Sequence, residues 1–305
     1  MKTTILRRFL LLQILVLIGL LGVGCQSKKT PVSPEKLTIG VVSYGEGTVS
    51  LDKYDRFKDY IAAQTQSIVD LEPAYNELQA LEQIRRKNWQ IVFAPPGLAA
   101  IAIGKELYIP IFSMEGISSR QRSLLVVRDD KPIKQIKDLT NKTVALGETG
   151  SAAGYYVPLY DLYGLTLSQI RFAPTPKTIL SWVSEGSVDA GGISENDFEQ
   201  YQREFGTTKF RIIHTSRWIP PGVVLIGPTI DRNLQEQIQK AMNDAPADIA
   251  GDAGYVPAAK IPNYDQFVKL VEKVRPLENR VKQTPAVLLR EESAERQKVK
   301  GQGGK

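Results

Sequence analysis

Residues 143–156 read TVALGETGSAAGYY. The first four are Thr143 and three apolar residues, and two of the four are β-branched, a pattern that predicts a short buried strand. Glycines and a serine follow, and these residues favour a tight turn and the start of a helix. The next segment predicts a helix over residues 153–163, ended by Gly164 as a C-terminal glycine cap. A strand that runs through a glycine-rich turn into a helix indicates an α/β fold.

The same alternation of strands and helices occurs on both sides of this unit. Apolar residues spaced three or four apart predict helices over residues 51–61 and 78–84. Residues 98–103 indicate a short buried helix, and residues 177–185 a later helix that ends at Gly186. Strands are predicted at residues 37–42, 67–71, 89–94, 109–113 and 123–128, and later at 188–190, 210–215 and 223–226. This rhythm predicts two tandem βαβ units with largely parallel sheets and a ligand cleft between two lobes. We expect ligands at the carboxyl ends of the strands, where helices begin.

The turn after the strand at residues 143–146 is the sharpest candidate site. A helix start presents free N–H groups and a partial positive charge, which together attract anions. Ser151 and the amides of Ala152, Ala153 and Gly154 are the candidate ligands, and Ser151 can add a hydroxyl donor. The alternative is that Ser151 or Thr149 only caps the helix. The local sequence leaves both interpretations open.

Several stretches resemble the phosphonate-binding family of ABC-transporter solute-binding proteins. They are residues 138–158, Gly186-Ser187-Val188-Asp189-Ala190, His214-Thr215-Ser216 with Ile219-Pro220, and the opening strand with Tyr44. The resemblance covers residues 37–274 and implies a two-lobed, type II periplasmic binding protein fold with two crossing segments acting as hinges. It also implies that the turn at residues 150–154 forms half of an oxyanion site. The expected lobes are residues 37–127 with 217–274, and residues 128–216.

The chain departs from the family pattern at positions that matter for the ligand. The family turn usually reads Ser-Thr-Ser, whereas here Ser151 is followed by Ala152 and Ala153. Pro95-Pro96-Gly97 stands where the family often has a tyrosine. Two side-chain donors are therefore missing, and the backbone amides must replace them. This favours a less polar or less charged ligand, or a different oxyanion. The alternative to a phosphonate-type ligand is therefore the same fold binding a sulfonate, a nitrate or a pyrimidine-type solute.

Three further side chains are candidates for the cleft. Tyr44 follows the first strand and is expected to oppose the anion turn. Tyr155 and Tyr156 open a helix, so we expect one of them to face the cleft and the other the core, and we assign Tyr155 to the ligand. Glu195 opens the helix after the strand at residues 188–190, where an acidic side chain also suits the helix dipole.

The first 24 residues predict a secretory signal. Basic residues precede an apolar run, and small residues precede Cys25. This pattern resembles a bacterial lipoprotein signal, with Cys25 as the lipidated residue. The alternative is an ordinary signal peptide or an uncleaved anchor with an incidental cysteine. Residues 25–36 are expected to form a linker, and residues 275–305 a charged and flexible tail.

Charge and composition exclude several classes of protein. Loss of the signal would lower the net charge from +6 to +3, and the excess lies in the tail, so no nucleic-acid partner is expected. One cysteine and one histidine, His214, give no metal site, no cofactor site and no catalytic set.

We therefore predict an exported, monomeric, lipid-anchored solute-binding protein rather than an enzyme. It would lie in the periplasm or on the outer face of the cell membrane. There it would capture a phosphonate, phosphite or phosphate and deliver it to an ABC permease. A ligand-sensing lipoprotein without transport is the alternative role.

Overall fold

The computed structural model describes residues 35–42, 51–114 and 121–289. A six-stranded sheet, in the order β12-β4-β11-β3-β1-β2, forms the first part of the fold. Its members are β1 (Lys36–Val42), β2 (Ile68–Ala74), β3 (Ile91–Ala94), β4 (Ile109–Met114), β11 (Val223–Ile226) and β12 (Tyr255–Val256). The first three strands lie where the sequence predicts them, because each is a short β-branched run between turn-forming residues.

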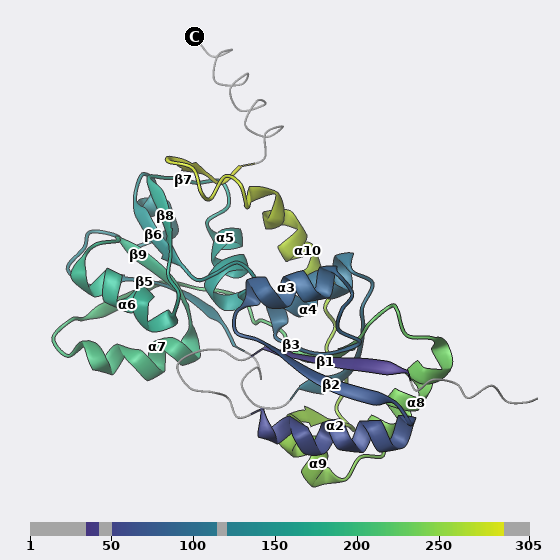
Figure 1. Ribbon diagram of the computed structural model, residues 1–305. Helices are drawn as coiled ribbons and strands as arrows, with labels where there is room; N and C mark the ends of the chain where they lie inside the picture. The colour runs from purple at the N-terminus through teal and green to yellow at the C-terminus, as the bar shows by residue number, and fades with distance from the viewer. Residues whose placement is uncertain (1–34, 43–50, 115–120, 290–305) are drawn as a thin grey trace, which may run out of the picture. The chain divides into compact units, whose positions relative to one another are not determined.

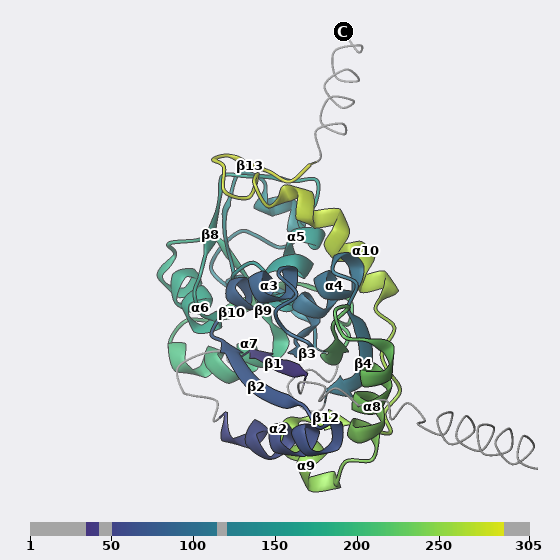
Figure 2. The same ribbon diagram turned by 45° about the vertical axis from the view of Figure 1, so that its right-hand side comes forward.

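Helices cover both faces of this sheet (Figures 1 and 2). On one face lie α2 (Asp52–Thr65), α8 (Arg232–Asn243) and α9 (Ala247–Ala253), and on the other lie α3 (Glu77–Arg85) and α4 (Pro96–Lys105). Phe57 and Ile61 of α2 are fully buried, as the predicted apolar stripe requires. Phe57 also meets the ring of Phe93 on β3 edge to face, at 5.4 Å between ring centroids.

A five-stranded sheet, in the order β10-β5-β9-β6-β8, forms the second part. Its strands are β5 (Ser123–Arg128), β6 (Thr143–Leu146), β8 (Gln169–Phe172), β9 (Ala190–Ser194) and β10 (Phe210–Thr215). The short helical turn η1 (Ile136–Leu139) precedes β6, and α6 (Pro176–Glu185), α7 (Glu195–Tyr201) and the turn η3 (Gln202–Phe205) connect the later strands. Gly186 ends α6 at φ 75°, as the sequence predicts for a glycine cap.

The prediction of largely parallel sheets is wrong. β1 is parallel to β2 and β3, but β11 is antiparallel to both β3 and β4. In the second sheet β6 is parallel to its neighbours, whereas β5 is antiparallel to β9 and β10. The reversal arises where the chain passes from one sheet to the other, after β4 and again after β10.

Hydrogen bonds join the outgoing and returning segments between the two sheets. The N–H of Met114 donates to the carbonyl of Gly222 at 2.9 Å, and Ile219 N–H donates to Gln121 O at 2.8 Å. At the second sheet, Ser216 N–H donates to Ser123 O at 2.9 Å, and Ser123 N–H donates to Ser216 Oγ at 2.8 Å. Ser123 and Ser216 are both buried. The two connections are thus bonded to each other near both ends.

The expectation of a flexible tail from residue 275 onward is wrong for its first fifteen residues. After α10 (Asp265–Val274), which packs on α4 and α5 (Val157–Asp161), the chain forms the turn η4 (Arg275–Leu277) and the strand β13 (Ala286–Val287). β13 pairs antiparallel with β7 (Thr166–Leu167). Figure 2 labels β13 near α10. The segment packs against the fold through four buried apolar residues, Leu277, Val281, Ala286 and Leu288. These residues do not follow a helical periodicity, and for that reason the sequence did not predict that the segment packs. Residues 290–305 lie outside the described part.

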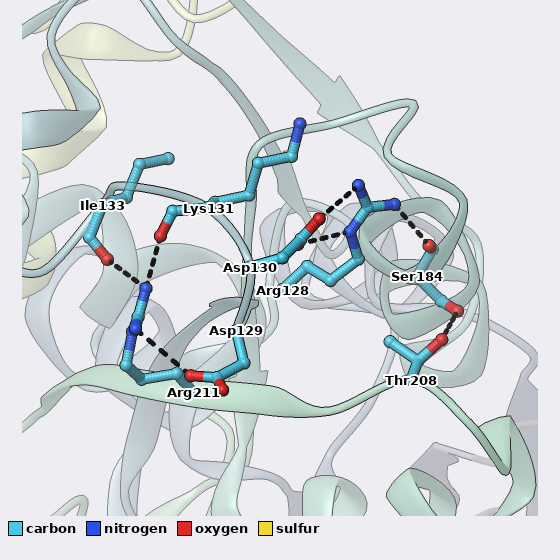
Figure 3. Close-up of polar contacts among 8 residues, drawn as sticks. All are labelled: Arg128, Asp129, Asp130, Lys131, Ile133, Ser184, Thr208 and Arg211. Atoms are coloured by element: carbon cyan, nitrogen blue, oxygen red, sulfur yellow. Dashed lines mark hydrogen bonds and ion pairs between the residues drawn. The ribbon is translucent and has the colours of Figure 1, made fainter.

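Two arginines hold the turn that follows β5 (Figure 3). Arg128 forms a bidentate ion pair with Asp130 at 2.7 and 3.0 Å and donates to the carbonyl of Ser184 at 3.1 Å. Arg211 on β10 pairs with Asp129 at 3.2 Å and donates to the carbonyls of Lys131 and Ile133. The acidic pair Asp129-Asp130 is therefore structural, because each carboxylate binds a different strand's arginine.

We predict that Leu288→Ala lowers the free energy of unfolding by about 2–4 kcal/mol, because it empties a buried site. Urea unfolding measures the change. Leu107→Ala is the matched control, since Leu107 is 73% exposed, and it should change the value by less than about 0.5 kcal/mol. Equal small losses in both variants would show that residues 275–289 contribute no packing energy.

Candidate functional site

The predicted anion turn is a π-helical turn. After β6, residues Ala152–Tyr156 form η2, and Val157–Asp161 continue as α5. The N–H groups of Tyr156 and Val157 donate to the carbonyls of Ser151 and Ala152, five residues back in each case. Such single π turns widen a helix start and occur often at functional sites. The sequence predicted one regular helix over residues 153–163, and Pro158 was the signal that the first turn would be irregular.

Ser151 is the N-cap of this turn. Its Oγ accepts a hydrogen bond from the Gly154 N–H at 3.1 Å, and the Gly154 carbonyl accepts from Gly147 N–H at 2.9 Å. Ser151 therefore caps the turn, and the Gly154 amide is already engaged. The amides of Ala152 and Ala153, by contrast, have no acceptor among the residues that the structure describes. They are the free donors at the positive end of this helix.

The first turn of α4 lies directly against this turn. A Cβ atom at Gly97 would lie 1.9 Å from the carbonyl oxygen of Gly150 and 2.9 Å from the nitrogen of Ala152. Only glycine allows this approach. The start of α4, which packs on the first sheet, therefore meets the start of η2, which follows β6 of the second sheet, at Ala152. The Pro95-Pro96-Gly97 departure from the family pattern places a bare backbone beside the candidate amides.

Glu77 is an acidic neighbour that the sequence interpretation missed. It opens α3, which is capped by Asn76 through a bond from Gln79 N–H at 2.9 Å. Gly150 adopts φ 111°, and a Cβ there would lie 2.2 Å from the Cβ of Glu77. Glu77 is only 9% exposed. Its position at a helix start was visible in the sequence, but its approach to residue 150 depends on the pairing of the two sheets.

The prediction that one tyrosine of the pair faces an open cleft is wrong. Tyr155 and Tyr156 are both buried, and their rings meet edge to face at 5.1 Å. Tyr155 also packs on Phe172 at 6.0 Å between centroids, and burial raises its pKa to about 12. The π turn directs the side chains of both Tyr155 and Tyr156 into the core. Their rings therefore pack under the turn and do not face a ligand.

The acidic candidates separate into structural and free groups. Asp189 accepts from the Thr143 N–H at 2.9 Å and is structural. Glu195 begins α7, its N–H donates to the Arg122 carbonyl at 3.0 Å, and it is half-buried. Its carboxylate forms no hydrogen bond or ion pair with another described residue. Tyr44 and Cys25 lie outside the described residues.

His214 pairs with Asp161 rather than with a catalytic set. Its Nε2 lies 3.1 Å from the Asp161 carboxylate. Burial raises the pKa of Asp161, and His214 and Arg217 partly oppose that rise. Across the described ranges, no group of three metal-ligating side chains occurs. None of the helices in those ranges is both long enough and apolar enough to cross a bilayer.

Two cavities lie away from the anion turn. One, of about 250 Å³, is lined by Trp218, Phe267 and Leu270, with others from the returning segment and α10. The second, of about 480 Å³, lies between β4 and α8. Neither cavity includes a residue of the turn. The candidate site is therefore identified by the chemistry of its free amides and not by the size of a cavity.

Comparison with known proteins identifies the family. The family described as "ABC transporter, phosphonate, periplasmic substrate-binding protein" matches residues 39–271. The chain belongs to this family of binding proteins, and the expected resemblance is confirmed. No curated protein sequence matches it.

Solved structures with the same fold share little sequence with the chain. XAC2383 from Xanthomonas citri, bound to chloride ion, is 17% identical with a TM-score of 0.64, and the match covers 79% of this chain and 99% of that one. PhnD1 from Prochlorococcus marinus, in complex with methylphosphonate, is 15% identical with a TM-score of 0.59, covering 79% and 98%. A binding protein of an ABC phosphonate transporter from Pseudomonas aeruginosa is 16% identical with a TM-score of 0.54, covering 73% and 80%. The predicted type II periplasmic binding protein fold is confirmed.

We predict that Gly150→Ala destabilises the protein more than Gly164→Ala. Both glycines have positive φ, at 111° and 101°, so alanine should cost about 1–2 kcal/mol at either position. Only at Gly150 would the new Cβ meet Glu77, whereas nothing lies within 4 Å at Gly164. Overpacking should add about 1–3 kcal/mol at Gly150 in chemical unfolding. Equal losses of unfolding free energy in the two variants would contradict this prediction, because they would mean that α3 shifts to accept the new Cβ without an energetic cost.

Proposed function

We propose that this periplasmic substrate-binding protein captures a small oxyanion of the phosphonate, phosphite or phosphate type at the amides of Ala152 and Ala153. The observation that supports the proposal most strongly is that these two N–H groups lack acceptors among the described residues, at the start of a helix. The methylphosphonate complex of PhnD1, which shares the fold, supports the same ligand class.

Backbone amides replace the hydroxyl groups that Ala152 and Ala153 lack. Each amide hydrogen bond to a charged oxygen contributes about 1.5–3 kcal/mol. The hydroxyl of Ser151 accepts from Gly154 and keeps its own hydrogen for donation to the ligand. Tyr44 and Glu195 remain proposed ligand contacts, on the opposing side and at the start of α7 respectively.

Ala152 and Ala153 stand where the family turn carries hydroxyl-bearing residues, so fewer donors remain for the ligand. This favours a ligand with less charge, and it makes an alkyl sulfonate the second candidate.

Ligand binding would favour closure of the two lobes. An oxyanion held by the Ala152 and Ala153 amides would also lie beside the first turn of α4, which belongs to the other sheet. A ligand that contacts both parts stabilises their closed arrangement. The closed protein would then deliver the ligand to the permease, with the proposed lobe boundaries after residues 127 and 216.

Calorimetric titration should show binding of methylphosphonate, phosphite or phosphate to the protein without its signal. An alkyl sulfonate tests the second candidate in the same series. Binding of the sulfonate alone would reassign the ligand, and heat from none of the four would contradict an oxyanion function.

Ala152→Pro should weaken this binding by at least about 10-fold, because it deletes one donor N–H. Proline fits the first position of a helix, and Ser151 has the extended backbone that proline requires before it. Arg232→Pro, at the first position of α8, is the matched control and should leave affinity unchanged. Unchanged affinity in a folded Ala152→Pro variant would contradict the assigned amides.

We also propose that Cys25 carries a lipid anchor, which would hold the protein close to its permease. The support is the signal-like sequence that precedes this cysteine. Cys25→Ala should move the protein from the membrane fraction to the soluble fraction of an expressing bacterium. Mass spectrometry of the mature N-terminus provides the second measurement, and an unmodified Cys25 would contradict the anchor.

A further inference from the structure

One carbonyl of the anion turn has no partner within its own helix. In the π pattern of this turn, the N–H five residues further on binds each carbonyl, as Tyr156 does for Ser151 and Val157 for Ala152. The next carbonyl is that of Ala153, and five residues further on is Pro158, which has no N–H. A buried carbonyl without a donor is unfavourable, so this group requires a bond from elsewhere.

The hydroxyl of Ser123 supplies that bond. Ser123 Oγ donates to Ala153 O at 2.7 Å, and the serine is 2% exposed. Ser123 is the first residue of β5, where the outgoing connection enters the second sheet. The bond therefore ties the backbone beside the free amides to the chain that links the two sheets.

The same serine is bonded to the returning connection. Its N–H donates to Ser216 Oγ at 2.8 Å, its carbonyl accepts from Ser216 N–H at 2.9 Å, and Ser216 Oγ donates to Arg217 O at 2.8 Å. Ser216 is also buried. One short chain of hydrogen bonds thus runs from the anion turn through Ser123 to both connections.

We propose that Ser123 is a positioning residue that couples the anion turn to the two connections between the sheets. It does not contact the ligand. It holds the peptide between Ala153 and Gly154, which follows the free amides of Ala152 and Ala153 along the chain and so limits their movement, and it transmits a shift of that peptide to Ser216. This inference rests on the proposed function for its ligand, but the coupling itself is a property of the protein without ligand.

Hydrogen exchange of the ligand-free protein tests the coupling directly. Ser123→Ala should speed exchange of peptides covering both residues 150–157 and residues 216–222, and Ser123→Thr, which keeps the hydroxyl, should restore protection. Thr65→Val is the matched control, because the Thr65 hydroxyl is buried and donates to a carbonyl, that of Ile61, at 2.8 Å within α2. It should leave both peptides unchanged.

Titration with methylphosphonate gives the second readout. Ser123→Ala should bind about 10-fold more weakly, the size expected for one lost hydrogen bond, while Thr65→Val should bind as the unmodified protein does. Faster exchange confined to residues 150–157 would overturn the coupling, as would unchanged exchange at both places. If the unmodified protein binds no oxyanion, the proposed function fails, and the exchange result still decides the role of Ser123.

Discussion

The carbonyl of Ala153 is the group on which the arrangement of the candidate site depends. Pro158 removes the N–H that a π-helical turn would offer it, and the buried hydroxyl of Ser123 takes that place at 2.7 Å. Because Ser123 begins β5 and is bonded to Ser216, the turn is fixed to the two connections rather than to its own helix alone. That attachment fixes the peptide between Ala153 and Gly154, which adjoins the free amides along the chain.

Backbone groups, rather than side chains, define the chemistry of this turn. Ser151 caps Gly154, and the amides of Ala152 and Ala153 remain free among the described residues. The bare backbone of Gly97 approaches to within contact of Gly150 and Ala152. A family member that lacks two hydroxyl donors can therefore still present an anion site, since the donors come from the peptide units.

Local patterns predicted most of the elements but not their pairing. The β-branched run of β1, the apolar stripe of α2 and the glycine cap at Gly186 all depend on near neighbours in sequence, and each was predicted correctly. The antiparallel placement of β11 depends on contacts between distant segments, and so it could not be read from periodicity. The docking of residues 275–289 was missed because Leu277, Val281 and Leu288 are spaced irregularly. In the candidate site, the resemblance to the family indicated residues 150–154. The positions of Glu77 and Ser123 beside this turn could be found only from the three-dimensional structure, because they come from distant parts of the sequence.

Oxyanion binding by this protein is proposed to depend on the amides of Ala152 and Ala153. The most direct test is a nuclear magnetic resonance titration of protein labelled with ¹⁵N-alanine, using methylphosphonate. We expect large downfield shifts of the Ala152 and Ala153 amide protons that saturate together with binding. Saturable binding that leaves these two resonances in place, while other alanines shift, would contradict it.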